Sequence, residues 1–169
     1  MNKNQVILQN VVFNYHPIFT KKKQLRNIAL KYPQYFNVEL LVEECFANVG
    51  SYKLNQTSHY DFSDYSDSKT SSISSNPLKT SKFQYRGEIR NVSTLSGHDK
   101  VGDLRCIVYN PHTLDLFYIF LPKPVWSSMV TRSKKKTAGI AYTYNSVYND
   151  IPKFIGYECE TFEELALLS

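Results

Sequence analysis

Glycine and cysteine are both scarce in this chain of 169 residues, which has 6 Gly and 3 Cys. So little glycine excludes a glycine-rich fibre or a long flexible linker. The cysteines, Cys45, Cys106 and Cys159, are odd in number and far apart, and none forms a C-x-x-C pair, which argues against a disulfide scaffold or a zinc ribbon. Unpaired cysteines in apolar surroundings are typical of a reducing compartment, so we expect a cytoplasmic protein.

Long hydrophobic runs are also missing. The longest, Leu116 to Leu121, has six residues, whereas a membrane helix needs about 20. The polar segment Met1 to Gln5 is followed by three apolar residues, Val6 to Leu8, before polar residues return. This pattern is not that of a signal peptide. We therefore expect no membrane segment and no secretion signal.

The composition is otherwise that of a globular protein rich in aromatic residues. Hydrophobic residues make up 42% and charged residues 21% of the chain, which includes 13 Tyr and 10 Phe. These values exclude wholesale disorder, and the length predicts one domain over residues 1–169. The net charge of +5 weakly favours an anionic partner.

Helical patterns dominate the first third of the chain. The clearest runs from Val38 to Gly50, where apolar residues recur at helical spacing after Asn37, a candidate N-cap. A second helix is expected over Gln24–Lys31, ended by Pro33. Residues Val6–Phe19 favour a strand or an irregular segment.

Strand patterns dominate the rest of the chain. A strand is expected from Phe83, and Leu104–Tyr109 and Leu114–Leu121 flank a turn at Asn110–Thr113, which indicates a hairpin. Another strand is expected at Ile140–Tyr144. Thr161 starts a T-x-x-E capping box before a short C-terminal helix. The sequence thus predicts an α+β fold with N-terminal helices, a central, mostly antiparallel or mixed sheet and a short C-terminal helix.

The first candidate site is the triplet Asp67-Ser68-Lys69 within a segment rich in serine and aspartate. In a strand, residues i and i+2 lie on one face, so the Asp67 carboxylate and the Lys69 ammonium would project together. Asp61 would lie on the same face if the strand ran unbroken, and Asp64 lies between Asp61 and Asp67 in the sequence. Carboxylates bind Mg²⁺ through hard oxygen ligands, and an ammonium can position or activate a water molecule. This arrangement suits metal-assisted phosphodiester hydrolysis.

On these residues the chain resembles the PD-(D/E)XK nuclease superfamily, which includes many type II restriction endonucleases. The resemblance implies that Asp67 is a metal ligand, Lys69 the catalytic lysine and Asp64 the earlier acidic ligand. Glu44, on the helix at 38–50, would add an optional carboxylate, so the implied metal set is Asp64, Asp67 and Glu44. It also implies a Mg²⁺ cofactor and a homodimer that matches a palindromic duplex.

The spacing departs from that of the family, which usually separates its two acidic positions by roughly ten or more residues. Here Asp64 and Asp67 are three residues apart. Two rival triplets, Glu88-Ile89-Arg90 and Asp103-Leu104-Arg105, carry arginine where the family has lysine. Arginine can stabilise charge but does not easily lose a proton. Whether Glu88 or Asp103 replaces Asp67 is left open.

A basic segment is the second candidate site. Arg132, Lys134, Lys135 and Lys136 lie between hydroxyl residues and precede a tyrosine-rich strand. Such a cluster suits contacts with phosphates, which position a nucleic acid without reading its sequence.

The predicted function is a Mg²⁺-dependent, sequence-specific endonuclease acting on double-stranded DNA. Asp64, Asp67 and Lys69 are its predicted catalytic residues, and the basic segment holds the DNA backbone. Two alternatives stay open. One is a non-catalytic nucleic-acid-binding module, in which the Ser/Asp-rich segment is a surface loop. The other is a phage- or plasmid-borne protein-interaction factor.

Overall fold

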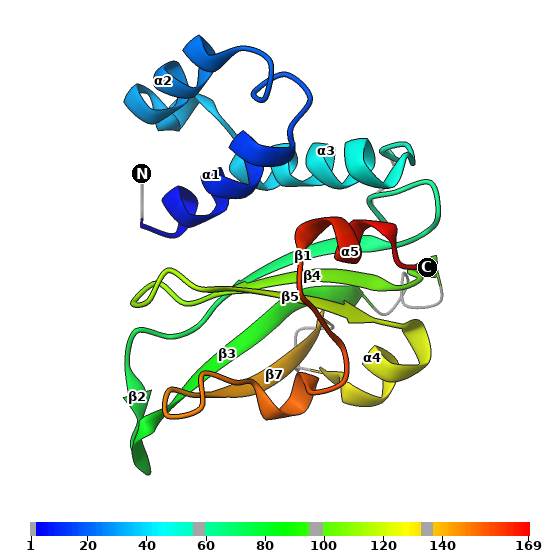
Figure 1. Ribbon diagram of the computed structural model, residues 1–169. Coiled ribbons are helices and arrows are strands. Elements are labelled where there is room, and N and C mark those ends of the chain that lie inside the picture. The colour runs from blue at the N-terminus through cyan, green and yellow to red at the C-terminus, as the bar shows by residue number, and fades with distance from the viewer. Residues whose placement is uncertain (1–2, 56–59, 95–99, 133–136) are drawn as a thin grey trace.

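The computed structural model describes residues 3–55, 60–94, 100–132 and 137–169, and it confirms the α+β class (Figure 1). The helices are α1 (Lys3–Tyr15), α2 (Lys23–Lys31), α3 (Val38–Gly50), α4 (Lys123–Met129) and α5 (Phe162–Leu167), with short 3-10 turns at Pro33–Tyr35 and Pro152–Phe154. The strands are β1 (Asp67–Ser72), β2 (Pro77–Leu78), β3 (Ser81–Thr94), β4 (Leu104–Tyr109), β5 (Leu116–Leu121), β6 (Thr131–Arg132), β7 (Thr137–Asn145) and β8 (Glu158–Cys159).

The strands form two sheets, where the sequence predicted one. The first sheet has the order β1-β4-β5-β8, and the second has the order β2-β3-β7-β6. The pairing of β1 with β4 is parallel, and the other ladders are antiparallel. Helices α1, α3 and α5 lie on the side of the first sheet away from β3 and β7 (Figure 1).

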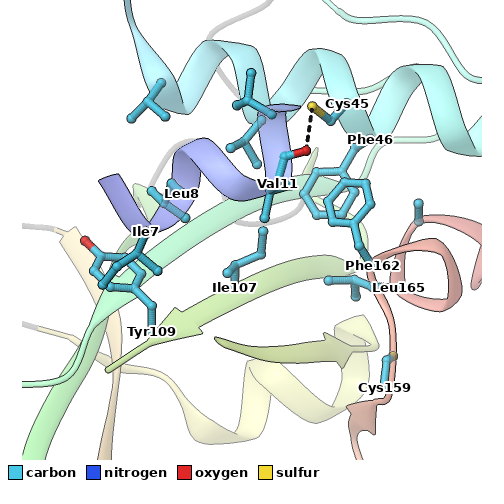
Figure 2. Packing of buried hydrophobic residues seen from close by; sticks show 14 of the residues in the cluster. Ile7, Leu8, Val11, Cys45, Phe46, Ile107, Tyr109, Cys159, Phe162 and Leu165 are labelled. Carbon is cyan, nitrogen blue, oxygen red and sulfur yellow. Dashed lines mark hydrogen bonds between the residues drawn. The ribbon is translucent and has the colours of Figure 1, made fainter. Parts of the chain in front are cut away.

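Strand β4 lies at the centre of these layers, and all six of its residues are buried. Because neighbouring side chains in a strand point to opposite faces, β4 contributes to two cores. Ile107 and Tyr109 pack beneath the helices, whereas Cys106 and Val108 belong to the core that includes residues of β3 and β7. Figure 2 shows Ile107 facing Val11, with Phe46 and Phe162 beside them.

Helix α3 has the bounds predicted from its apolar spacing. The Asn37 side chain accepts a hydrogen bond from the backbone N–H of Leu40 at 3.2 Å, so the predicted N-cap is confirmed. Its buried residues include Val42 and Phe46. The Sγ of Cys45 lies 3.9 Å from the carbonyl oxygen of Val11, where α3 packs on α1 (Figure 2).

The expectation of an extended or irregular segment over Val6–Phe19 is wrong, because residues 3–15 form α1. Ile7, Leu8, Val11 and Val12 are all buried and recur at spacings of one and four residues, which places them on one side of a helix. The contact with α3 overrides the preference of β-branched residues for strands.

The remaining predicted elements are confirmed with small shifts. Strands β4 and β5 form the expected hairpin, although β5 begins at Leu116 because Leu114 adopts a left-handed backbone conformation in the turn. The Thr161 side chain accepts a hydrogen bond from the backbone N–H of Glu164, and the Glu164 carboxylate accepts one from the backbone N–H of Glu160. In the described part of the chain, no helix is long and apolar enough to cross a bilayer.

Candidate functional site

A polar cleft of about 990 Å³ opens along β1. Its lining comes from helix α3, the turn before β1, β1 itself with the residues that follow it, and the middle of β3. Lys69 lies in this lining together with Asp61 and Glu43. Within the Ser/Asp-rich segment, residues Asp67–Ser72 form the polar strand β1, which borders this cleft.

Strand geometry places Asp67 and Lys69 side by side at the start of β1. The Lys69 Nζ lies 3.2 Å from an oxygen of the Asp67 carboxylate, and the two side chains are only 20% and 8% exposed. The pair is therefore largely shielded from water, which strengthens its electrostatic interaction.

A bulge in β3 supplies a further contact for Lys69. Between the pairs Ile89–Ile140 and Ser93–Ala138, β3 has two more residues than β7, and Asn91 within this bulge has φ of 53°. Asparagine tolerates this left-handed conformation better than most residues. The carbonyl oxygen of Asn91 accepts a hydrogen bond from Lys69 Nζ at 2.7 Å. The bulge therefore holds the ammonium group beside Asp67.

Asp61 reaches the same place through a tight turn. The backbone N–H groups of Asp61 and Phe62 both donate to the carbonyl of Ser66, so the chain reverses just before β1. The Asp61 carboxylate then accepts a hydrogen bond from the backbone N–H of Ser68 at 2.8 Å. It also shares a hydrogen bond with the Asp67 carboxyl group.

Two carboxyl groups of this site, those of Asp67 and Glu43, have raised pKa values. Burial, followed by the contact with Asp61, raises the pKa of Asp67 to about 8, although Lys69 opposes the shift. Burial and the charges of Asp61 and Glu39 raise the pKa of Glu43 to about 7. Burial is the largest cause of both shifts, because it disfavours the charged carboxylate, and a nearby positive charge would offset it.

Of the two neighbouring glutamates in α3, Glu43 faces the cleft and Glu44 does not line it. A carboxylate oxygen of Glu44 lies 2.5 Å from Nε2 of the buried His16, which ties α3 to the residue after α1. The structure thus brings Glu43 to the cleft near Asp61 and Lys69, whereas Glu44, the helical ligand implied by the sequence resemblance, is engaged elsewhere.

Asp64 is also engaged elsewhere. Its carboxylate accepts hydrogen bonds from the Ser66 hydroxyl at 2.5 Å and from the buried guanidinium of Arg105 at 2.9 Å. Burial alone would raise the pKa of Asp64, but the hydrogen bonds from Ser66 and Arg105 outweigh it and lower the pKa. The structure does not bring Asp64 to Asp67 and Lys69; Asp61 takes that place.

The rival triplets have different surroundings. Glu88 borders the cleft, is half exposed and lies 3.8 Å from Arg90. The Asp103 carboxylate accepts a hydrogen bond from the backbone N–H of Lys123, the first residue of α4, and so caps that helix. The Lys69 ammonium contacts Asp67 and Asn91, and neither Glu88 nor Asp103 takes part in these two contacts.

The basic segment lies partly outside the described residues. Lys134, Lys135 and Lys136 lie outside the described residues, and Arg132 belongs to β6, paired with Ala138. Phosphate binding by this segment stays a prediction.

The donor set near Lys69 fits a magnesium ion in chemical type. Asp61, Asp67 and Glu43 offer carboxylate oxygens, which Mg²⁺ prefers. Among the described residues, no group of three or more His, Cys, Asp and Glu side chains is already arranged as a metal site. The contact of Asp61 with Asp67 instead favours the protonated form of Asp67, whose pKa it helps to raise.

Comparison of the chain with models of known protein families finds no match, and no curated protein matches it.

Proposed function

We propose that the protein is a Mg²⁺-dependent nuclease that hydrolyses phosphodiester bonds in this cleft. The observation that carries the proposal is the contact of the buried Asp67 carboxylate with the Lys69 ammonium at 3.2 Å, where Lys69 and Asp61 line an open polar cleft. The similarity of the Asp67-Ser68-Lys69 triplet to the PD-(D/E)XK nucleases supports the same reaction.

In this proposal Asp61 and Asp67 would hold the cation, and Glu43 would add a third carboxylate from the cleft lining. When bound there, Mg²⁺ would supply positive charge next to the scissile phosphate and the attacking water. Lys69, held by the Asn91 carbonyl, positions that water and offsets the negative charge that develops on the phosphate oxygens.

The test is a cleavage assay on duplex and single-stranded DNA with Mg²⁺ or with EDTA. We expect Mg²⁺-dependent cleavage, and a loss of at least about 100-fold in kcat for Asp67→Asn and Lys69→Ala. Cleavage that persists in EDTA, or in both variants, would refute the assignment.

Neighbouring glutamates provide a matched control. Glu43→Gln removes a carboxylate that lines the cleft, whereas Glu44→Gln removes one that contacts His16. We expect Glu43→Gln to lower activity at limiting Mg²⁺ and Glu44→Gln to leave it close to that of the wild type. The opposite order would restore Glu44 as the helical ligand.

A further inference from the structure

The floor of the cleft beyond Lys69 is built from hydroxyl groups. Strand β1 and the residues after it carry Ser68, Thr70, Ser72, Ser74 and Ser75 along the lining. At about 3.3 Å per residue, the strand part of this stretch, from Lys69 to Ser72, extends for about 10 Å. Ser68, Thr70 and Ser72 alternate with Lys69 along β1, so they border the cleft from the strand face opposite to that of the Lys69 ammonium. Hydroxyl groups of this kind can bind phosphate oxygens.

Two arginines of β3 form the wall on one side of this floor. Arg86 and Arg90 both line the cleft. They are four residues apart in the strand, so they project from the same face about 13 Å from each other. Arg90 is 79% exposed and its nearest carboxylate, that of Glu88, is 3.8 Å away. In the described part of the chain, no carboxylate lies within salt-bridge distance of Arg86.

The wall leads directly to the proposed catalytic lysine. Arg90 precedes Asn91, whose carbonyl oxygen holds Lys69. A chain of phosphates that contacts Arg86 and Arg90 would therefore pass next to Lys69 and Asp67. On the opposite side Glu39 and Glu43 of α3 repel phosphates. The arginine side carries Glu88 between Arg86 and Arg90, but its two cations outnumber that one carboxylate, which favours a polyanion on this side.

The lining offers little that could bind nucleobases. Among the residues that the structure describes, it contains no aromatic side chain, and its larger apolar residues are Ile73, itself buried, and Pro111. Stacking on aromatic side chains is the usual way to hold bases of a single strand. Hydroxyl and guanidinium groups that contact phosphates carry no sequence information.

We infer that this cleft binds the sugar–phosphate backbone of a nucleic acid through Arg86, Arg90 and its hydroxyl floor, so that binding does not depend on the base sequence. The inference builds on the proposed nuclease function and assigns its substrate contacts. It departs from the sequence-specific cleavage expected from the amino-acid sequence.

The experiment measures binding separately from cleavage. Fluorescence anisotropy in EDTA would follow a labelled single-stranded DNA, the same DNA with its sequence scrambled, and the corresponding RNA. We expect the two DNA sequences to bind within about twofold of each other. Arg86→Ala/Arg90→Ala should weaken binding about tenfold or more, and it should reduce the slope of log K against log salt by roughly 1.4, about 0.7 for each phosphate that an arginine no longer neutralises.

Two further variants serve as controls. Lys31→Ala/Lys79→Ala removes the same charge from exposed positions that do not line the cleft, so it should change affinity by less than about twofold. Arg86→Lys/Arg90→Lys keeps the charge and should recover part of the affinity.

The outcomes separate this inference from the proposed function. Cleavage that is unaffected in KM by Arg86→Ala/Arg90→Ala would overturn the inference and leave the nuclease function intact. Arginine-dependent binding without any cleavage would support the inference and overturn the nuclease function. A scrambled sequence that binds more than about tenfold more weakly would also overturn the inference. Equal binding of DNA and RNA would support it, because the two share the phosphodiester backbone that the cleft contacts.

Discussion

Replacement of Arg105 by methionine should destabilise the protein more than removal of any ion pair on its surface. Arg105 is 2% exposed, and its guanidinium donates to the carbonyl of Leu165 in α5 at 2.6 Å and to the Asp64 carboxylate at 2.9 Å. It also lies over the ring of Tyr52 at 5.0 Å. The side chain thus joins β4, the C-terminal helix and the turn that carries Asp61.

The expected loss is about 3 kcal/mol. Methionine restores most of the apolar packing but leaves the Leu165 carbonyl without its charged donor, which costs about 1.5–3 kcal/mol. Asp64 is 37% exposed and keeps its hydrogen bonds with Ser66. Its share of the loss is therefore near that of a surface pair, about 1 kcal/mol or less. Asp64→Asn alone should accordingly cost about 1 kcal/mol.

Urea unfolding followed by the fluorescence of Trp126 measures these differences, because it is the single tryptophan of the chain and is fully buried. The double variant Arg105→Met/Asp64→Asn completes a thermodynamic cycle, and we expect a coupling energy of about 1 kcal/mol or less. Because the pKa of Asp64 is lowered in the folded protein, its contribution is present above about pH 4 and is lost as the pH falls further. A loss below about 1 kcal/mol for Arg105→Met at neutral pH would refute the reasoning.

Three further predictions follow from burial and capping. Burial raises the pKa of Cys45 and Cys106 to about 12 and that of Cys159 to about 11. A thiol reagent at pH 8 should therefore label none of the three cysteines until the protein is unfolded. Rapid labelling of the folded protein would contradict this prediction. In EDTA, the wild type should lose stability as the pH rises from about 4 to about 8, because the pKa of Asp67 is raised in the folded protein and the unfolded chain releases this proton first. In a plot of Tm against pH, the Asp67→Asn variant should lack this part of the slope. Asp103→Ala removes the acceptor for the first N–H of α4 and should cost about 1 kcal/mol in urea unfolding, whereas Asp103→Asn should cost less because an oxygen acceptor is retained.

Elements defined by local spacing could be predicted from the sequence. Helix α3, with Asn37 as its cap, and the hairpin of β4 and β5 have strong patterns within a few residues. The division of the strands into two sheets could not be predicted in the same way. It depends on the pairing of β3 with β7, whose residues lie about 50 positions apart, as Glu88 and Ala141 do. Helix α1 shows the same limit, since its contact with α3 decides its conformation.

The Asp67–Lys69 contact was predictable because strand geometry alone places residues i and i+2 together. Glu43 gave no such signal, since nothing in the amino-acid sequence reports that α3 packs beside the turn before β1. The bulge that turns the Asn91 carbonyl toward Lys69 is only weakly indicated in the sequence, by an asparagine within a long strand.

The choice between Asp61 and Asp64 shows why distance along the chain is a poor guide to a site. A buried guanidinium is costly unless it is paired, and Arg105, fixed in the central strand β4, requires a carboxylate nearby. Asp64 meets that requirement, and its hydrogen bonds with Ser66 fix the turn at 62–65. The same turn carries Asp61 back to Ser68 and Asp67. The acid nearest to Asp67 in sequence thus stabilises the turn, and the acid three residues further away enters the cleft. If this division is correct, Asp64→Asn should lower stability with kcat retained, and Asp61→Asn should lower kcat with stability retained.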